Sequence, residues 1–230
     1  RETGTLSTWC AEHFPEFLSV RGRKALEGGL LHRLDYETRG LVFAALTQRV
    51  MDNMTRQQED GLFIKEYEAI AGAGEGEPIR GFPPRPFDEN FASLATRGFY
   101  VDSGFRYYGK GRKSVRPVIP CCAAASNQNT RVYRTEIVGA DKEKENFWRI
   151  HARLTRGFRH QIRCHLAWLG LPIRGDILYG GRGGGPAFAL RAIALKFADP
   201  LSGTPRYIQY HDNELKPPPP ERPAADRVVR

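Results

Sequence analysis

Three short segments of the chain carry residues whose types and spacing suit chemistry. The segment HRLD ends at Asp35, an acid that lies between Arg33 and Arg39 where two apolar runs are interrupted. The segment IKEYEA places Tyr67 in a strand-like alternation, and LTRGFRHQIRCHL brings three arginines to the start of a predicted helix. A carboxylate can serve as a nucleophile or a base, while arginines and the free N–H groups of a helix start attract anions. These segments are therefore candidates for a reactive site with an anionic partner.

Each segment also has an ordinary structural interpretation. Asp35 suits a turn in which the carboxylate accepts nearby backbone N–H groups. Tyr67 suits a strand aromatic that fills the core, and Arg159 and Arg163, four residues apart, suit a solvated helix face. The residue types alone leave both interpretations open.

The net charge of the chain favours an anionic binding partner. Lys and Arg number 35 against 26 Asp and Glu, which gives a net charge of +9 and an isoelectric point near 9.6. Such a balance favours nucleic acid first and an acidic membrane second, although a basic surface without a special partner also fits. No apolar run approaches the roughly 20 residues that span a bilayer. The start of the chain lacks the form of a secretory signal. It also lacks an initiator Met, so we expect the given sequence to begin inside a domain.

The cysteines and histidines indicate no metal site. There is no CxxC pair and no Cys/His cluster at zinc-finger spacing, and His160 and His165 are five residues apart, so they do not share one helix face. Four cysteines in 230 residues do not make a disulfide scaffold, so we expect the protein to lie in a reducing cytoplasm. The cysteines are Cys10, Cys121, Cys122 and Cys164.

Hydrophobic periodicity and turn residues predict a mixed α+β fold in which antiparallel strands outnumber helices. Gly and Pro are dense after residue 71, so residues 71–130 are predicted to be long loops with short strands, and residues 140–145 to be a polar turn. The last residues are predicted to be a Pro-rich surface tail. The expected helices are residues 6–20, 47–58 and 160–169, and the expected strands are residues 30–31, 41–46, 61–72, 131–139, 146–154 and 187–197.

Taken in order, these segments resemble the RluA family of RNA pseudouridine synthases. The resemblance rests on LLHRLDYETRGLVFAALT, IKEYEAIAG, LTRGFRHQIRCHLAWLGLPIRGDILYGG and ALRAIALKFADPLSG, and it extends from about residue 25 to residue 210. It implies a catalytic domain over residues 1–215, followed by the tail at 216–230, with a mainly antiparallel sheet, flanking helices and loops, and a central basic cleft. It also implies isomerisation of a uridine in ribosomal or transfer RNA to pseudouridine, without a metal or organic cofactor. Separately from the resemblance, we expect a monomer.

The resemblance also assigns roles to residues. Asp35 would be the catalytic aspartate, Tyr67 would stack on the flipped target base, and Arg163 would pair with Asp35. Flipping is expected because a base inside a stack is inaccessible. The remaining matches would contact RNA: Arg33, Arg39, Arg156, Arg159, His160 and Gln161.

The chain departs from the usual family pattern at several positions. Phe158 and Arg159 replace a polar pair, Tyr36 and Arg39 stand in the segment after the catalytic aspartate, and Arg191 replaces a common His. An early KP.G-type strand and an S4-like RNA-binding domain are not visible in the sequence. Two other functions remain as alternatives, a non-catalytic RNA-binding protein on the same scaffold and a metal-dependent nuclease that uses Asp35.

Overall fold

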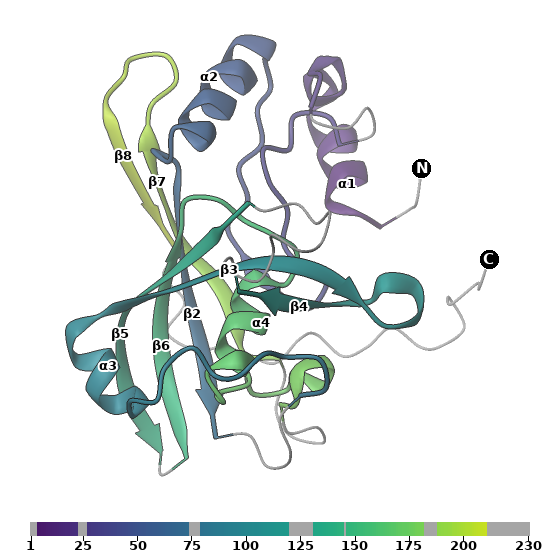
Figure 1. The fold of residues 1–230 in the computed structure, drawn as a ribbon. Helices are drawn as coiled ribbons and strands as arrows, with labels where there is room; N and C mark the ends of the chain where they lie inside the picture. The colour runs from purple at the N-terminus through teal and green to yellow at the C-terminus, as the bar shows by residue number, and fades with distance from the viewer. Residues whose placement is uncertain are drawn as a thin grey trace.

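A single eight-stranded sheet organises the structure (Figure 1), a computed structural model that describes residues 4–22, 27–73, 79–119, 131–144, 146–181 and 188–210. The strand order is β1-β7-β2-β6-β5-β3-β4, and β8 also pairs with β7. The β1–β7 pair is parallel, whereas the other pairs between these strands are antiparallel. The strands are β1 (Arg39–Gly40), β2 (Ile64–Gly72), β3 (Phe99–Tyr108), β4 (Ser114–Val118), β5 (Tyr133–Lys144), β6 (Phe147–Leu154), β7 (Leu190–Ala198) and β8 (Pro205–Gln209).

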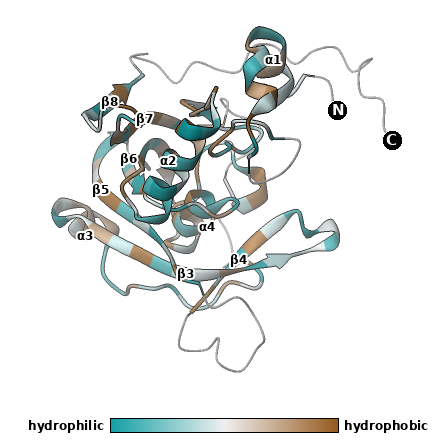
Figure 2. Cartoon of the chain, turned by 90° about the horizontal axis from the view of Figure 1, so that it is seen from above, coloured by the Kyte–Doolittle hydropathy of each residue, from teal (hydrophilic) through white to brown (hydrophobic). Residues whose placement is uncertain are grey.

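One helix is buried at the centre of the fold. All eight residues of α4 are buried, and in the view of Figure 2 the strands curve around it. A helix that is covered on every side belongs to the core rather than to the surface. The other α-helices are α1 (Leu6–His13), α2 (Gln48–Glu59) and α3 (Phe91–Arg97), with α4 at Gln161–Trp168, and short 3₁₀ turns lie at Pro15–Ser19, Lys110–Arg112 and Ile177–Tyr179. None of these helices is long and apolar enough to cross a membrane.

The main hydrophobic core forms where β2, β6 and β7 meet α4. Ile70, Ile150 and Leu166 have no solvent exposure, and they pack in one cluster with Ala192 and Ile173. Side chains on a strand alternate between its faces, so β2 buries every second residue along its first half and then becomes buried on both faces. The helix α4 therefore packs against the middle of the sheet through this core.

Several expected elements are confirmed. Thr47 caps α2, since its hydroxyl accepts the Val50 N–H, and the helix ends at Glu59, close to the predicted boundary. The strands β2, β6 and β7 and the helix α4 also lie where periodicity places them. The α+β class and the mainly antiparallel sheet are confirmed as well.

Two predictions for the first fifty residues are wrong. The helix expected over residues 6–20 ends at His13 because Phe14 precedes Pro15, and a proline disfavours helical backbone at the residue before it. The apolar runs at 30–31 and 41–46 are not regular strands. They pair at an isolated bridge between Leu30 and Ala44 and pack in one hydrophobic cluster. The two-residue strand β1 lies between them in the sequence.

The later loops are more regular than predicted. The ten-residue strand β3 and the helix α3 lie inside the region expected to be loops, and β5 continues through the predicted turn to Lys144. Strand β8 was not predicted. Tertiary pairing explains these differences, because each of these strands gains ladder hydrogen bonds from a neighbour that local propensity does not reveal. Residues 74–78 and 120–130 of the predicted loop, with Cys121 and Cys122, and the tail at 216–230 fall outside the described residues.

Candidate active site

The loop that carries Asp35 is held to the sheet by a close backbone contact. Thr38 donates its N–H to the Asp35 carbonyl (3.0 Å), which closes a turn with Tyr36 at its exposed tip. Gly40 follows with φ +118°, and a Cβ atom there would lie 2.0 Å from the Ala192 carbonyl oxygen. Only glycine permits this approach of β1 to β7. The short parallel pair therefore fixes the loop of Asp35 beside β7, which also pairs with β2, the strand that carries Tyr67.

Tyr67 projects from an irregular point of β2. The pairing of β2 with β7 shifts register between Glu66 and Tyr67, and bulges of this kind re-aim side chains near active sites. On its two sides Tyr67 faces the small residues Ala152 and Ala192, which leave room for a large ring. Burial, and then the negative charge of Asp35, raise the pKa of Tyr67 well above its ordinary value. Tyr67 is thus a buried, neutral phenol within the electrostatic range of Asp35.

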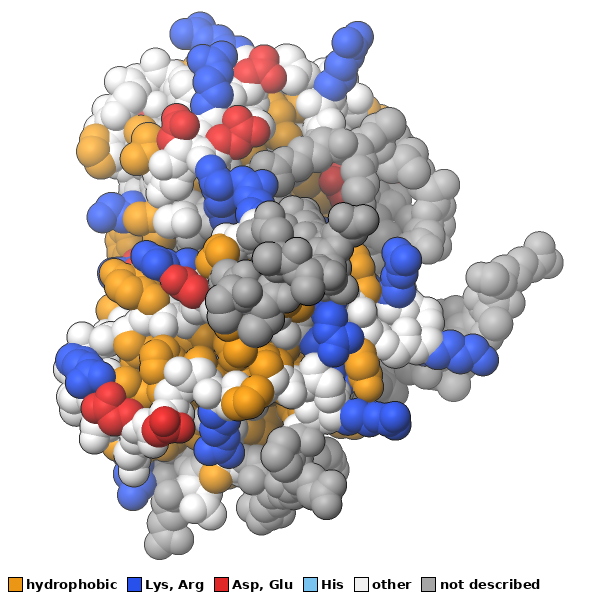
Figure 3. All heavy atoms as spheres, viewed as in Figure 1, with side chains coloured by type: hydrophobic (Ala, Val, Ile, Leu, Met, Phe, Trp, Pro, Cys, Tyr) orange, Lys and Arg blue, Asp and Glu red, His pale blue; other side chains and the backbone are white. Residues whose placement is uncertain are grey.

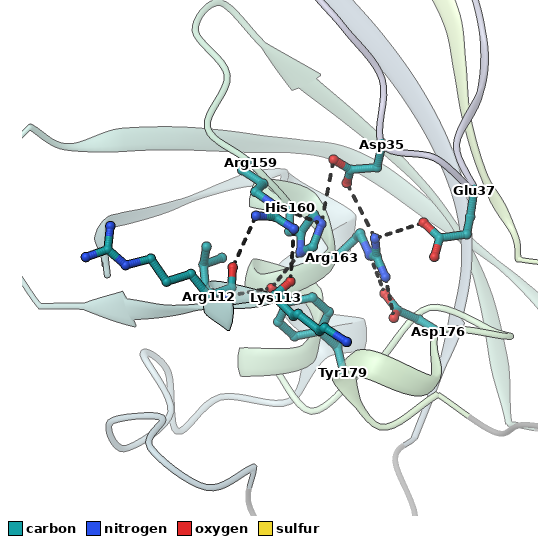
Figure 4. Close-up of polar contacts among 10 residues, drawn as sticks. Asp35, Glu37, Arg112, Lys113, Arg159, His160, Arg163, Asp176 and Tyr179 are labelled. Carbon is teal, nitrogen blue, oxygen red and sulfur yellow. Dashed lines mark hydrogen bonds and ion pairs between the residues drawn. The ribbon is translucent and has the colours of Figure 1, made fainter. Parts of the chain in front are cut away.

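Arg163 lies at the centre of the site (Figure 4). It projects from α4, and its side chain is 3% exposed. Its Nε and Nη2 atoms donate to the two carboxylate oxygens of Asp176 at 2.7 and 2.8 Å, a bidentate geometry. Its Nη1 atom faces the other way, 3.3 Å from Oε2 of Glu37 and 3.6 Å from Oδ2 of Asp35. One guanidinium therefore connects three carboxylates.

The charge state of Asp35 results from opposing influences. Burial raises its pKa above the ordinary value, Arg163 acts in the opposite direction, and Glu37 raises it again. The net effect is a raised pKa, so the ionised form is less stable in the protein than in water. A carboxylate in this environment is a stronger base and nucleophile than a solvated one.

The arginines predicted to contact RNA lie in different environments. Arg33 is exposed and Arg39 is half-buried in β1. Arg156 is exposed and donates to the Glu59 carbonyl, while Arg159 is exposed and donates from Nη1 and Nη2 to the carbonyls of Arg112 (3.1 Å) and Lys113 (3.2 Å). Arg159 thereby ties the start of α4 to the β3–β4 hairpin.

The β3–β4 hairpin presents cations and aromatic rings together. Lys110, Arg112 and Lys113 are exposed at its tip, and Lys and Arg side chains stand out on this side of the molecule in Figure 3. Tyr107 is 49% exposed and lies beneath the Arg112 guanidinium at 5.8 Å. Interleaved cations and rings suit single-stranded RNA.

Gln161, which was predicted to contact RNA, is directed into the protein. It is 2% exposed, accepts the Phe158 N–H at 2.9 Å, and donates to the Arg134 carbonyl (2.9 Å) and the Thr135 hydroxyl (3.1 Å). These bonds hold the turn before α4 against β5, so the visible contribution of Gln161 is to the placement of Arg163. His160 is also buried. Its Nδ1 atom lies 3.1 Å from the Tyr179 hydroxyl, and its Nε2 atom accepts the Nε–H of Arg159 at 3.4 Å and lies 3.8 Å from Oδ1 of Asp35.

Three residues of the site were missed by reasoning from the sequence. Asp176 and Tyr179 lie in the segment GDILYGG, which is part of a motif that resembles the family, but the sequence analysis gives neither residue a role. Glu37 is two residues from Asp35. A signal did exist for Asp176, because a buried arginine in a helix requires a buried anion and an acid in a family motif is a natural candidate.

The described fold is shared with solved pseudouridylate synthase domains. The human RNA Pseudouridylate Synthase Domain Containing 1 superposes with a TM-score of 0.61 at 20% identity, over 92% of this chain and 76% of that one. The human RNA Pseudouridylate Synthase Domain Containing 4 superposes with a TM-score of 0.53 at 18% identity, over 80% and 70% of the two chains. The fold class is therefore that of these synthase domains.

The family follows from sequence comparison. The family model described as RNA pseudouridylate synthase matches residues 4–168, and the chain belongs to this family, which confirms the resemblance seen in its motifs. Ribosomal large subunit pseudouridine synthase D of Vibrio parahaemolyticus is 27% identical over 223 residues, which cover 90% of this chain and 57% of the relative. The Haemophilus influenzae protein of the same name is 26% identical over 215 residues, covering 87% and 56%. The chain thus spans little more than half the length of these relatives.

Proposed function

We propose that this protein isomerises a uridine in RNA to pseudouridine, with Asp35 as the reacting group. The observation that carries the proposal is the position of the Asp35 carboxylate, which lies 3.6 Å from the Arg163 guanidinium (Figure 4) and near enough to the buried Tyr67 for its charge to raise the pKa of that phenol. The reaction breaks the glycosidic bond, turns the base and joins C5 to the sugar. A carboxylate held in this way can act as a nucleophile at the sugar or as a base during these steps.

The surroundings of Asp35 match what the reaction requires. The carboxylate must be ionised, and Arg163 favours that form although burial opposes it. An aromatic platform supports a base that has left its stack, and Tyr67 provides one from β2. The exposed cations on the β3–β4 hairpin and at Arg33, Arg156 and Arg159 are proposed to bind the phosphate backbone around the target.

The substrate class is proposed to be ribosomal RNA. The relatives are named for the large ribosomal subunit, and the sequence-based expectation included transfer RNA as well. The expectations of a cytoplasmic monomer, of a catalytic domain over residues 1–215 and of catalysis without a cofactor belong to the same proposal.

The test compares wild type with a variant in which one oxygen of the Asp35 carboxylate is replaced by an amide nitrogen. Wild type and Asp35→Asn are incubated with unmodified total RNA, and pseudouridine is mapped by chemical modification and sequencing. Asp141→Asn, an exposed change on β5, is the matched control and should retain wild-type activity. Sites made by wild type and the control but absent with Asp35→Asn support the proposal and identify the target uridine.

Two outcomes would contradict it. If wild type binds RNA but forms no pseudouridine, the non-catalytic RNA-binding alternative is favoured. If a chelator abolishes the activity, a metal-dependent reaction takes its place. The geometry argues against the second outcome, because the space between Asp35, Glu37 and Asp176 already contains the cationic Arg163.

A further inference from the structure

One arginine fastens the tip of the β3–β4 hairpin to the residues before α4. Arg159 donates from Nη1 to the Arg112 carbonyl at 3.1 Å and from Nη2 to the Lys113 carbonyl at 3.2 Å (Figure 4). A longer bond of 3.4 Å joins its Nε–H to Nε2 of His160. The two carbonyls are 47 and 46 residues away from Arg159 in the sequence. These three contacts, the Arg159 clamp, therefore join two segments that are far apart along the chain.

Both segments that the clamp joins contain an unfavourable backbone conformation. Arg112 has φ 52° and His160 has φ 55°, and within the described ranges these are the two residues other than glycine with a positive φ. Such residues are uncommon, and they keep this conformation where surrounding contacts hold them, often at functional sites. The clamp provides contacts of this kind, because the carbonyl of Arg112 and the ring of His160 both accept from Arg159.

The residue before Arg159 packs against the same hairpin. The ring of Phe158 is stacked on that of Phe105 in β3, with centroids 5.0 Å apart and an interplanar angle of 5°. It also lies near the rings of Tyr107 and Tyr133, at 5.9 and 5.1 Å. Aromatic contacts of this kind stabilise a structure beyond the area that they bury. Phe158 and Arg159 stand where the family pattern has a polar pair, so this departure places two side chains that hold the hairpin.

The hairpin held in this way presents cations to the solvent. Lys110, Arg112 and Lys113 are all exposed at its tip. The Arg112 side chain points away from the clamp (Figure 4), and its guanidinium lies 5.8 Å from the centre of the Tyr107 ring. Like charges this close in the sequence repel one another, so the tip is stabilised by contacts that fix its backbone and by an anion that neutralises its charge.

We propose that Arg159 is a positioning residue, which holds the β3–β4 hairpin in its RNA-binding conformation before RNA binds. The inference rests on the proposed function, in which this hairpin binds the RNA backbone. A loop that is already ordered in the free protein binds more tightly, because the entropic cost of ordering it is not part of the binding step. Arg159 therefore contributes to RNA affinity through the backbone of the hairpin, in addition to its own charge.

Hydrogen exchange of the free protein measures how firmly the hairpin is held. In Arg159→Gln the amides of residues 105–118 should exchange about tenfold faster than in wild type, because the bidentate contact to the two carbonyls is lost. Arg206→Gln is the matched control, since this exposed arginine on β8 contacts Asp199 and not the hairpin, and its hairpin should exchange as in wild type. Wild-type exchange of the hairpin in Arg159→Gln overturns the proposal.

RNA affinity separates the clamp from a direct phosphate contact. Dissociation constants for a labelled oligouridylate are measured over a series of salt concentrations. Arg159→Lys keeps the charge but lacks the planar fork, so its dissociation constant should rise about threefold to tenfold at an unchanged salt slope. If Arg159 acts only on phosphate, Arg159→Lys binds as wild type does, and Arg159→Gln alone loses affinity together with about one unit of the slope. That result overturns the proposal.

Single-turnover rates distinguish positioning of the hairpin from a part in the reaction itself. With saturating RNA that contains the mapped target uridine, Arg159→Lys should form pseudouridine at the wild-type rate, because the charge near Asp35 is kept. A lower rate at saturation with an unchanged dissociation constant overturns the proposal. If wild type makes no pseudouridine at all, the proposed function fails, while hydrogen exchange still decides whether Arg159 holds the hairpin.

Discussion

The buried ion pair between Arg163 and Asp176 should make the stability of the fold sensitive to the loss of either partner. Asp176→Asn keeps the shape of the side chain but removes its charge, leaving a guanidinium that is 3% exposed without its nearest counter-ion. Breaking a buried pair from one side costs about 3–5 kcal/mol. The carboxylates of Glu37 and Asp35, at 3.3 and 3.6 Å, offset part of this loss. We therefore expect the free energy of unfolding to fall by about 3 kcal/mol, the lower end of that range.

Urea unfolding followed by the fluorescence of the three tryptophans measures this change. At an unchanged slope, 3 kcal/mol corresponds to a midpoint lowered by about 1 M urea. Asp102→Asn is the control, since its ion pair with Arg134 is as short (2.6 Å) but far more exposed, and it should cost less than about 1 kcal/mol. If the two variants lower the free energy of unfolding equally, burial of the unpaired charge is not the source of the cost.

Replacing both partners separates stability from function. The double variant Arg163→Met with Asp176→Leu removes both buried charges and fills their space with apolar atoms. Such exchanges are often neutral, so its unfolding free energy should be within about 1 kcal/mol of wild type. Activity should nevertheless be lost, because Asp35 loses its cation. A double variant less stable than Asp176→Asn would refute the reasoning.

Three further predictions concern the loop that carries Asp35. The pKa of Asp35 is raised on folding, so its contribution to stability is present at low pH and is lost as the pH rises through the pKa of the folded state. Asp35→Asn should therefore raise the melting temperature at pH 7. A melting temperature below that of wild type contradicts this prediction. Gly40→Ala should lower the free energy of unfolding by about 2 kcal/mol or more, because φ is +118° at this position and the new Cβ would lie 2.0 Å from the Ala192 carbonyl oxygen. An unchanged midpoint of thermal unfolding would show that β1 is not fixed against β7 there. Tyr36 is fully exposed beside Asp35, where its ring is available to stack on an RNA base. Tyr36→Ala should weaken RNA binding about tenfold in a filter assay, whereas Tyr36→Phe should bind as wild type does. Equal RNA affinity of the two variants excludes stacking.

The chain's local patterns were sufficient to locate the family and several elements. The order of HRLD, IKEYEA and HQIR indicated the RNA pseudouridylate synthase family, which the family model confirms. The N-cap of α2 at Thr47 and the helix that carries Arg163 followed from capping residues and periodicity. These features depend on interactions between residues a few positions apart, so they can be predicted from short stretches of sequence.

The partners inside the site were decided by the tertiary structure. Arg163 was expected to pair with Asp35, yet its two shortest bonds go to Asp176, and Asp35 is at 3.6 Å. The contact between His160 and Tyr179 likewise depends on how the turn after Ile173 returns to α4. A buried charge takes the counter-ion that the folded backbone brings to it, and that choice follows from packing over the whole sheet. The sequence by itself determined which groups are available for chemistry, and only the fold decided which of them touch.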